Sequence, residues 1–282
     1  MKIDMHVHVT PLEIINNYQH YAQKEAYFGL LANTPHNKFA TAEQVVQEMK
    51  ITGYDKSVIF GFSFADMGLC QYVNDYVIEA VKKYPDELIG FISVVPNHKQ
   101  VCYEIERCYN KGLRGIGELF PAGQPFEITK KEDILLFAQC CENYNMPVIV
   151  HMNEPVGHYY EGKTSTSLKE IETFILNHPT LKVILAHFGG GIWQYELMKE
   201  VKSAFENVYY DNAASIFLYE PRIYQTIKAA GLMDKFFFGS DYPLLSPSRY
   251  EKSLLNSGLN QEDLDKLQGE NAKRLLKNCH IL

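Results

Sequence analysis

The chain has 282 residues, of which 46% are hydrophobic and 22% are charged, as in a soluble globular protein with a large core. Its formal net charge of −7 and the lack of any long run of lysine and arginine argue against nucleic acid or an anionic membrane as a partner. The N-terminus lacks an apolar signal region and no stretch of eighteen apolar residues occurs, so we expect a cytoplasmic protein with a small-molecule substrate.

Eight apolar segments with the character of β-strands follow one another along the chain. They cover residues 2–9, 57–62, 89–95, 114–120, 147–153, 182–188, 207–212 and 235–240. Segments with helical periodicity separate them, at residues 41–52, 70–84, 98–111, 131–144, 167–178, 193–206 and 219–230. The first of these helices opens with a capping box from Thr41 to Gln44 and is followed by Gly53.

This alternation of strand and helix predicts an α/β fold with a parallel sheet. Eight buried strands fit a closed (β/α)8 TIM barrel, with residues 1–282 as a single domain. An open doubly wound sheet is the alternative, but no G-x-G-x-x-G motif follows the first strand. Nothing in the sequence sets the oligomeric state, and a homodimer is expected only because dimers are common.

Side chains that can bind a metal lie on the first strand and at the ends of four later ones. His6 and His8 are two positions apart, so they and Asp4 are expected on one face of their strand. The four later strands end in Glu118, His151, His187 and Asp241. Since the C-terminal ends of barrel strands carry active sites, we expect these side chains to converge there.

Three imidazoles and one carboxylate, from His6, His8, His151 and Asp241, form a ligand set that suits Zn²⁺, with manganese, iron or nickel also compatible. A bound cation would lower the pKa of water to about 7, and Asp241 could accept the proton as general base. His187 could polarise the substrate, shuttle a proton or bind a second metal.

Glu118 decides between one metal ion and two. If its carboxylate coordinates, it could bridge two cations, with His151 and His187 sharing the second; if it turns away, a single ion remains. The sequence favours one ion.

Two connections, residues 9–40 and 152–166, are longer than a barrel needs and should cover or contact the substrate. Their aromatic side chains could instead pack against one another. Candidate cationic groups for a substrate carboxylate are His158, Lys163 and Arg222, although most such side chains are merely solvated.

These segments resemble the amidohydrolase superfamily, and within it the amidohydrolase-related branch that includes aminocarboxymuconate-semialdehyde decarboxylase-like enzymes. The resemblance rests on Asp4-Met5-His6-Val7-His8 and on the segments at residues 151–163, 186–191, 210–214, 238–243 and 269–276. It implies a TIM barrel with His6, His8, His151 and Asp241 as metal ligands and His187 as a catalytic or second-metal residue. Glu118 stands where the binuclear members have a carbamylated lysine and looks more like the deoxyribonuclease-type relatives, whereas the decarboxylase-like members manage with one metal.

Two reactions fit this site. Metal-activated water could hydrolyse a small amide, lactone or ester, or the metal and His187 could support non-oxidative decarboxylation of a small carboxylic acid. Hydrolysis is preferred because Glu118 allows a second metal. A third hypothesis is a binding protein that has kept a structural ion.

Three further features are interpreted as structural. Asp211 is expected to cap the following helix rather than to orient a ligand, and Asp4 is either a buried core carboxylate or a support for a ligand. The cysteines lack C-x-x-C spacing and are expected to be reduced, packed thiols. They are Cys70, Cys102, Cys108, Cys140, Cys141 and Cys279.

Overall fold

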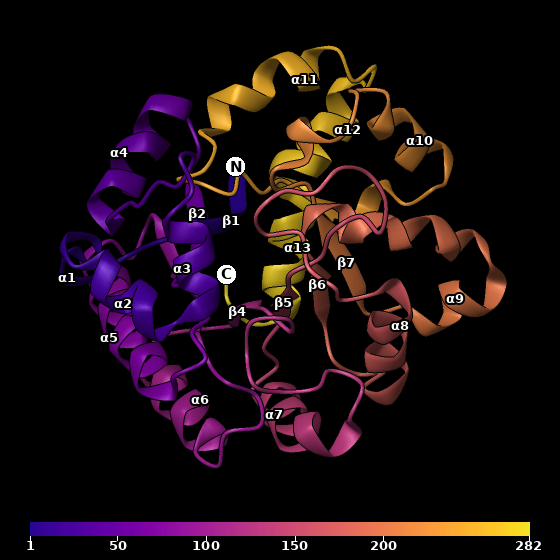
Figure 1. The fold of residues 1–282 in the computed structure, drawn as a ribbon. Helices are drawn as coiled ribbons and strands as arrows, with labels where there is room; N and C mark the ends of the chain where they lie inside the picture. Colours follow the sequence, from indigo (N-terminus) through magenta and orange to yellow (C-terminus); the bar gives the residue numbers. More distant parts are fainter.

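Eight parallel strands form a ring in the computed structural model, which describes residues 1–282 (Figure 1). The strands are β1 (Ile3–His8), β2 (Lys56–Phe60), β3 (Leu88–Gly90), β4 (Ile116–Leu119), β5 (Val148–Val150), β6 (Val183–Leu185), β7 (Val208–Asp211) and β8 (Phe236–Phe237). Parallel bridges from Ile92 to Ile116 and from Val7 to Tyr242 join the sheet β1–β3 to the sheet β4–β8. The predicted (β/α)8 TIM barrel is confirmed, with all eight strands in the predicted places but shorter.

The chain has thirteen α-helices, most of which surround this ring (Figure 1). They are α1 (Leu12–Asn16), α2 (Tyr18–Lys24), α3 (Ala26–Ala32), α4 (Ala42–Thr52), α5 (Met67–Lys83), α6 (Val101–Asn110), α7 (Lys131–Asn143), α8 (Leu168–Asn177), α9 (Lys199–Ala204), α10 (Ile223–Ala229), α11 (Glu251–Leu255), α12 (Gln261–Asp265) and α13 (Asn271–Asn278). The capping box predicted for α4 is present, because the Thr41 side chain accepts a hydrogen bond from the Gln44 amide and the Gln44 side chain accepts one from the Thr41 amide. Gly53 ends the helix at a positive φ of 72°.

The hydrophobic core has two parts. The larger part includes Val45, Val77 and Phe174 on the helices and Val148 on β5, so it fills the layer between the ring and its helices. The smaller part fills the inside of the ring with strand side chains, and α13 adds to it. Its members include Met5, Phe60, Phe91, Ile149, Ile184, Phe237, Ala272, Leu275 and Leu276. Figure 1 shows α13 across the middle of the ring. The six possible metal ligands lie at the ends of the strands that are opposite α13. They are His6, His8, Glu118, His151, His187 and Asp241.

Strand β1 is irregular in a way that the sequence did not reveal. Its register against β2 shifts between Asp4 and Val7. Asp4 therefore lies with Val7 and with Met49 of α4 around a small cavity outside the ring, whereas the rings of His6 and His8 contact Phe60 inside it. The prediction that Asp4 shares the face of both histidines was wrong, because a bulge changes the alternation of side chains.

Two stretches of helix differ from the prediction. Only Lys199–Ala204 of the segment 193–206 forms an α-helix. The chain before it turns in the left-handed sense, with positive φ at every residue from His187 to Gly191, so a right-handed helix cannot begin there. The long connection 9–40 contains α1–α3, and α11–α13 follow β8; none of these was predicted. No helix is long and apolar enough to span a bilayer.

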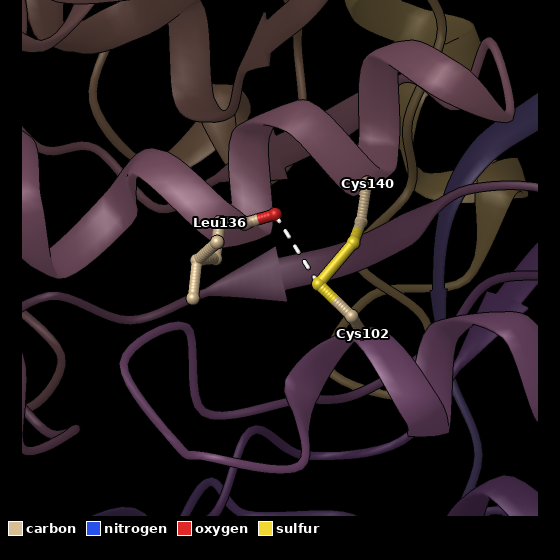
Figure 2. Close-up of a disulfide and its surroundings, with 3 residues drawn as sticks. All are labelled: Cys102, Leu136 and Cys140. Carbon is tan, nitrogen blue, oxygen red and sulfur yellow. Dashed lines mark hydrogen bonds between the residues drawn. A yellow bond between two sulfur atoms is a disulfide. The ribbon is translucent and has the colours of Figure 1, made fainter.

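A disulfide joins Cys102 of α6 to Cys140 of α7 (Figure 2). The expectation that both are reduced thiols was wrong, because α6 and α7 pack side by side and bring the two Cα atoms to 5.9 Å across a separation of 38 residues. Sequence spacing does not show such a contact. The other four cysteines are free and buried, as expected.

Candidate active site

The six residues predicted to converge do so at one end of the barrel. His6 and His8 lie in β1 and Glu118 in β4, whereas His151, His187 and Asp241 lie in the connections that follow β5, β6 and β8. Four of them are buried, with relative exposures of 0% for His6, 6% for Glu118, 8% for His151 and 9% for His187, whereas His8 and Asp241 are partly exposed. Carboxylates and imidazoles this far from solvent need partners of opposite charge or hydrogen bonds.

The first cluster joins the two ends of the sequence. His6 Nε2 lies 3.3 Å from His8 Nε2, and Asp241 Oδ1 lies 3.4 Å from His8 Nε2 and 3.7 Å from His6 Nε2. Ligand atoms bound to a tetrahedral ion at about 2.1 Å are about 3.4 Å apart. The three atoms therefore have the spacing of ligands around a single ion.

The second cluster has the same spacing. His151 Nδ1 lies 3.2 Å from His187 Nε2, and Glu118 Oε1 lies 2.9 Å from the former and 3.4 Å from the latter. The other carboxylate oxygen of Glu118 faces the first cluster, 3.8 Å from His6 Nε2 and 3.6 Å from His8 Nε2. Glu118 thus stands between the two clusters, as its bridging role would require.

In His187 and His151, the ring nitrogen that points away from the cluster is held by a hydrogen bond to a backbone carbonyl. His187 Nδ1 donates to the Ala213 carbonyl at 2.9 Å, and His151 Nε2 donates to the Gly162 carbonyl at 3.0 Å. Carbonyl oxygens only accept, so the second nitrogen of each neutral ring points into the cluster with a lone pair. When both rings are neutral, their lone pairs face the carboxylate oxygens, and a divalent cation would satisfy both kinds of ligand. The donor set fits a metal.

His6 is held by Asp211, which corrects the sequence interpretation of that aspartate. Asp211 Oδ2 accepts from His6 Nδ1 at 2.9 Å, while Oδ1 accepts the backbone N–H groups of His187 and Ala213, both at 3.0 Å. The residue is fully buried and makes these bonds inside the site, so capping is not its main role. The sequence did contain a signal for this role, because Asp211 is a carboxylate at the end of β7, between the strands that precede His187 and Asp241.

The charges of the site shift its pKa values. Burial disfavours the charged form of His6, but the carboxylates of Asp211 and Glu118 outweigh burial and raise its pKa to about 9. The pKa of His187 rises to about 10, because Glu118 outweighs burial there as well. Burial alone would raise the pKa of Asp241, but the hydrogen bond to His8 and the nearby imidazoles lower it to about 2. The carboxylates of Asp211 and Glu118 thus favour positive charge within the site.

Asp4 supports this site from outside the ring. Its Oδ1 accepts the backbone N–H groups of Ser240 at 2.9 Å and of His6 at 3.2 Å. Burial raises the pKa of Asp4 to about 7. One hydrogen bond holds the backbone of His6, and the other holds that of Ser240, which precedes Asp241. Of the two roles considered for Asp4, the geometry therefore favours support for the ligands over a buried core carboxylate.

Backbone strain gathers at the same end of the barrel. Four of the six non-glycine residues with positive φ lie there: His187, Phe188, Ala214 and Asp241. Such conformations persist only where the surroundings enforce them, and they are typical of functional sites. Gly190 belongs to the same turn, and a Cβ on it would lie 2.2 Å from a backbone carbonyl oxygen.

A cavity of about 730 Å³ opens above the two clusters. His8, Glu118, His151, His187 and Asp241 form its floor. The walls combine aliphatic and polar side chains with the aromatic ones of Phe28, Phe39, Phe62, Phe120, Tyr160 and Phe217. A volume of this size suits a small organic molecule.

Both long connections contribute to the walls, as expected, but not with every aromatic residue. Phe28 and His36 come from the first connection, and His158 and Tyr160 from the second. By contrast, the ring of Tyr18 lies 5.9 Å from that of Phe39 and does not line the cavity. In part of the first connection, the aromatic side chains therefore pack against one another, which was the alternative prediction.

Of the three predicted substrate-binding residues, only His158 lines the cavity. Lys163 binds carbonyl groups of its own loop, among them that of Gly157 at 3.2 Å. Arg222 is 79% exposed and pairs with Glu220 at 2.7 Å, away from the cavity. The cationic lining residues that the sequence interpretation missed are Lys38 and Arg249. Lys38 lies in a connection already expected to contact substrate.

Solved structures of other proteins share this fold over almost the whole chain. The 5-carboxyvanillate decarboxylase of Sphingomonas paucimobilis is 14% identical, with a TM-score of 0.78 and 98% of each chain covered. The same enzyme from Novosphingobium aromaticivorans, in complex with manganese, is 18% identical, with a TM-score of 0.76 and 98% of this chain and 96% of that chain covered.

A third similar structure is that of a probable 2-pyrone-4,6-dicarboxylic acid hydrolase from Acinetobacter baumannii. It is 16% identical, with a TM-score of 0.67, and the match covers 98% of this chain and 99% of that chain. Identities this low establish the fold and leave the reaction open. The family is established by sequence: the family model described as Amidohydrolase matches residues 3–277, so the chain belongs to the amidohydrolase family.

Proposed function

We propose that the protein is a metal-dependent hydrolase of a small amide, lactone or ester. The observation that carries the proposal is the position of Glu118, which has one carboxylate oxygen beside the imidazole nitrogens of His6 and His8 and the other beside those of His151 and His187. A site that holds two cations side by side is suited to activating water and stabilising the oxyanion of an acyl transfer. Zn²⁺ is the proposed metal, because it binds both imidazole and carboxylate ligands.

His6, His8 and Asp241 would hold one ion, and His151, His187 and Glu118 the second. A bound divalent cation supplies Lewis-acid polarisation of a carbonyl group and a lowered pKa for water. The number of ions stays a prediction: the spacing of the ligand atoms favours two, whereas the sequence favoured one.

Asp241 is the proposed general base. Its side chain is 13% exposed and borders the cavity, so it can reach water as well as His8. It would take the proton of the attacking water and pass it to the leaving group, as a general base and then acid. The aromatic walls would exclude bulk water from this transfer.

Decarboxylation is the second candidate. The solved relatives that are named 5-carboxyvanillate decarboxylase share the fold over 98% of this chain, and an aromatic cavity would accept an aromatic acid. In that reaction His187, which borders the cavity, would protonate the carbon from which carbon dioxide leaves. The two reactions differ in a product that can be measured.

The test starts from metal content per chain, measured by mass spectrometry on wild type and on Glu118→Gln. The matched control is Glu79→Gln, because Glu79 is 73% exposed and remote from the site. We expect two equivalents in wild type and in the control, and one in Glu118→Gln. One equivalent in all three proteins would remove the observation on which hydrolysis rests.

Reactions of the metal-loaded enzyme in ¹⁸O-labelled water then separate the two chemistries. A panel of aromatic amides, lactones, esters and carboxylic acids is incubated, and products are analysed by mass spectrometry. Hydrolysis places one ¹⁸O atom in the acid product, whereas decarboxylation releases carbon dioxide. Release of carbon dioxide without ¹⁸O in any acid product would replace the first proposal with the second.

A further inference from the structure

Two exposed cationic residues that line the cavity, Lys38 and Arg249, are here called the cationic rim, and His36, which is also exposed, lines the cavity two residues before Lys38. His36 and Lys38 lie in the connection after β1, and Arg249 lies in the segment Pro247–Tyr250 after β8. The two segments meet at the end of β1, because the Thr10 amide donates to the Ala40 carbonyl and the His8 amide donates to the Tyr242 carbonyl. The rim is therefore formed by adjacent loops.

Arg249 differs from the other arginines of the chain. Arg107 and Arg222 pair with carboxylates, and Arg114 and Arg274 donate to backbone carbonyls. The side chain of Arg249 is exposed and makes no hydrogen bond or ion pair with the protein. Its guanidinium group is a planar fork that can bind a carboxylate through two parallel hydrogen bonds.

The remaining charges of the cavity give the occupant an orientation. The acidic lining residues are Glu118 and Asp241, which belong to the two clusters on the floor, and Glu161, which lies in the connection after β5. The rim segments carry no acidic lining residue of their own. In a chain with a net charge of −7, this side of the mouth is the part of the cavity that favours an anion.

We propose that the cationic rim binds a carboxylate of the substrate. The scissile carbonyl would lie at the floor, an aromatic body between the phenylalanine walls, and the carboxylate at Arg249 and Lys38. This inference rests on the proposed function and narrows it to amides, lactones or esters of aromatic compounds that carry a free carboxylate. Arg249 and Lys38 then determine specificity and take no part in the reaction itself.

Binding of two matched probes tests this without turnover. The anionic 4-carbamoylbenzoate and the neutral terephthalamide have nearly the same shape, and their dissociation constants are measured by ligand-observed NMR on metal-loaded and on metal-stripped protein. The double variant Arg249→Gln with Lys38→Gln removes the rim charges. Arg222→Gln is the control, because Arg222 lies outside the cavity.

We expect wild type to bind the anion about tenfold more tightly than the neutral probe, with or without metal. That preference should fall below about threefold in the double variant and persist in Arg222→Gln. Equal affinities in wild type, a preference that survives the double variant in metal-stripped protein, or no binding of either probe would each overturn the proposal. The binding test requires no catalysis. If the protein prefers the anion through the rim but hydrolyses none of the substrates, the proposed function is refuted and the proposal about the rim stands.

Discussion

Replacing Asp211 by asparagine should weaken metal binding while leaving the barrel folded. One carboxylate oxygen accepts from His6 Nδ1, and the other accepts from two backbone N–H groups. An asparagine has a single side-chain oxygen. If that oxygen keeps the two backbone groups, the new NH₂ faces His6 Nδ1, which must then accept, and the ring proton moves to Nε2.

His6 Nε2 is the atom that lies 3.3 Å from His8 Nε2 in the first cluster, so a proton there occupies the lone pair that a metal needs. The opposite amide orientation would leave two buried N–H groups facing an NH₂, at a cost of about 1–3 kcal/mol for each. The first orientation is therefore expected. Loss of such a supporting hydrogen bond lowers metal affinity by about 10–100-fold.

The assay is competition for Zn²⁺ with a fluorescent chelator, accompanied by circular dichroism to confirm the fold. Asp86→Asn is the matched control, since the Asp86 side chain is exposed and makes no hydrogen bond. An affinity of folded Asp211→Asn within about threefold of wild type would refute the argument that Asp211 sets the tautomer of His6.

Three further predictions concern stability. Replacing Cys102 and Cys140 by alanine should lower the free energy of unfolding by about 4 kcal/mol, because the bridge closes a loop of 38 residues; equal urea midpoints for wild type with and without reductant would contradict this. Glu104 is fully buried against Arg107, and these contacts outweigh burial and lower its pKa, so Glu104→Gln should lose about 2 kcal/mol at pH 7. A carboxylate with a lowered pKa stabilises above its unfolded pKa, so the loss should shrink in urea titrations below about pH 4, and a constant loss would count against it. Gly190→Ala should lose about 2 kcal/mol or more from its positive φ and its clash with a backbone carbonyl, and an unchanged melting temperature would show that the turn can relax.

Periodicity was enough to predict the ring of strands. Apolar runs separated by amphipathic segments are compatible with few folds. In a barrel, residues such as Glu118 and His151 lie at the same end whatever the conformation of the loops. The side chains that converge could therefore be named before any contact was known.

What the sequence left open depends on contacts between distant segments. The pairing of Cys102 with Cys140 follows from the packing of α6 on α7, and the place of Asp4 follows from a bulge in β1. Arg222 and Arg249 both follow strands, yet only Arg249 reaches the cavity. Loop conformation decides which of them faces inward, and periodicity carries no information about it.

The seam at which the barrel closes passes through the first ligand cluster. His6 and His8 belong to β1 and Asp241 follows β8, and the Ser240 amide bonds Asp4 across 236 positions of sequence. We expect contacts this distant to form late in folding, because closing so long a loop costs chain entropy. An ion bound there would stabilise the closed ring, since the open ring presents only part of the ligand set. Metal availability would thus set how long β1 exposes an unpaired edge to other chains, which makes the site a determinant of aggregation during folding as well as of chemistry.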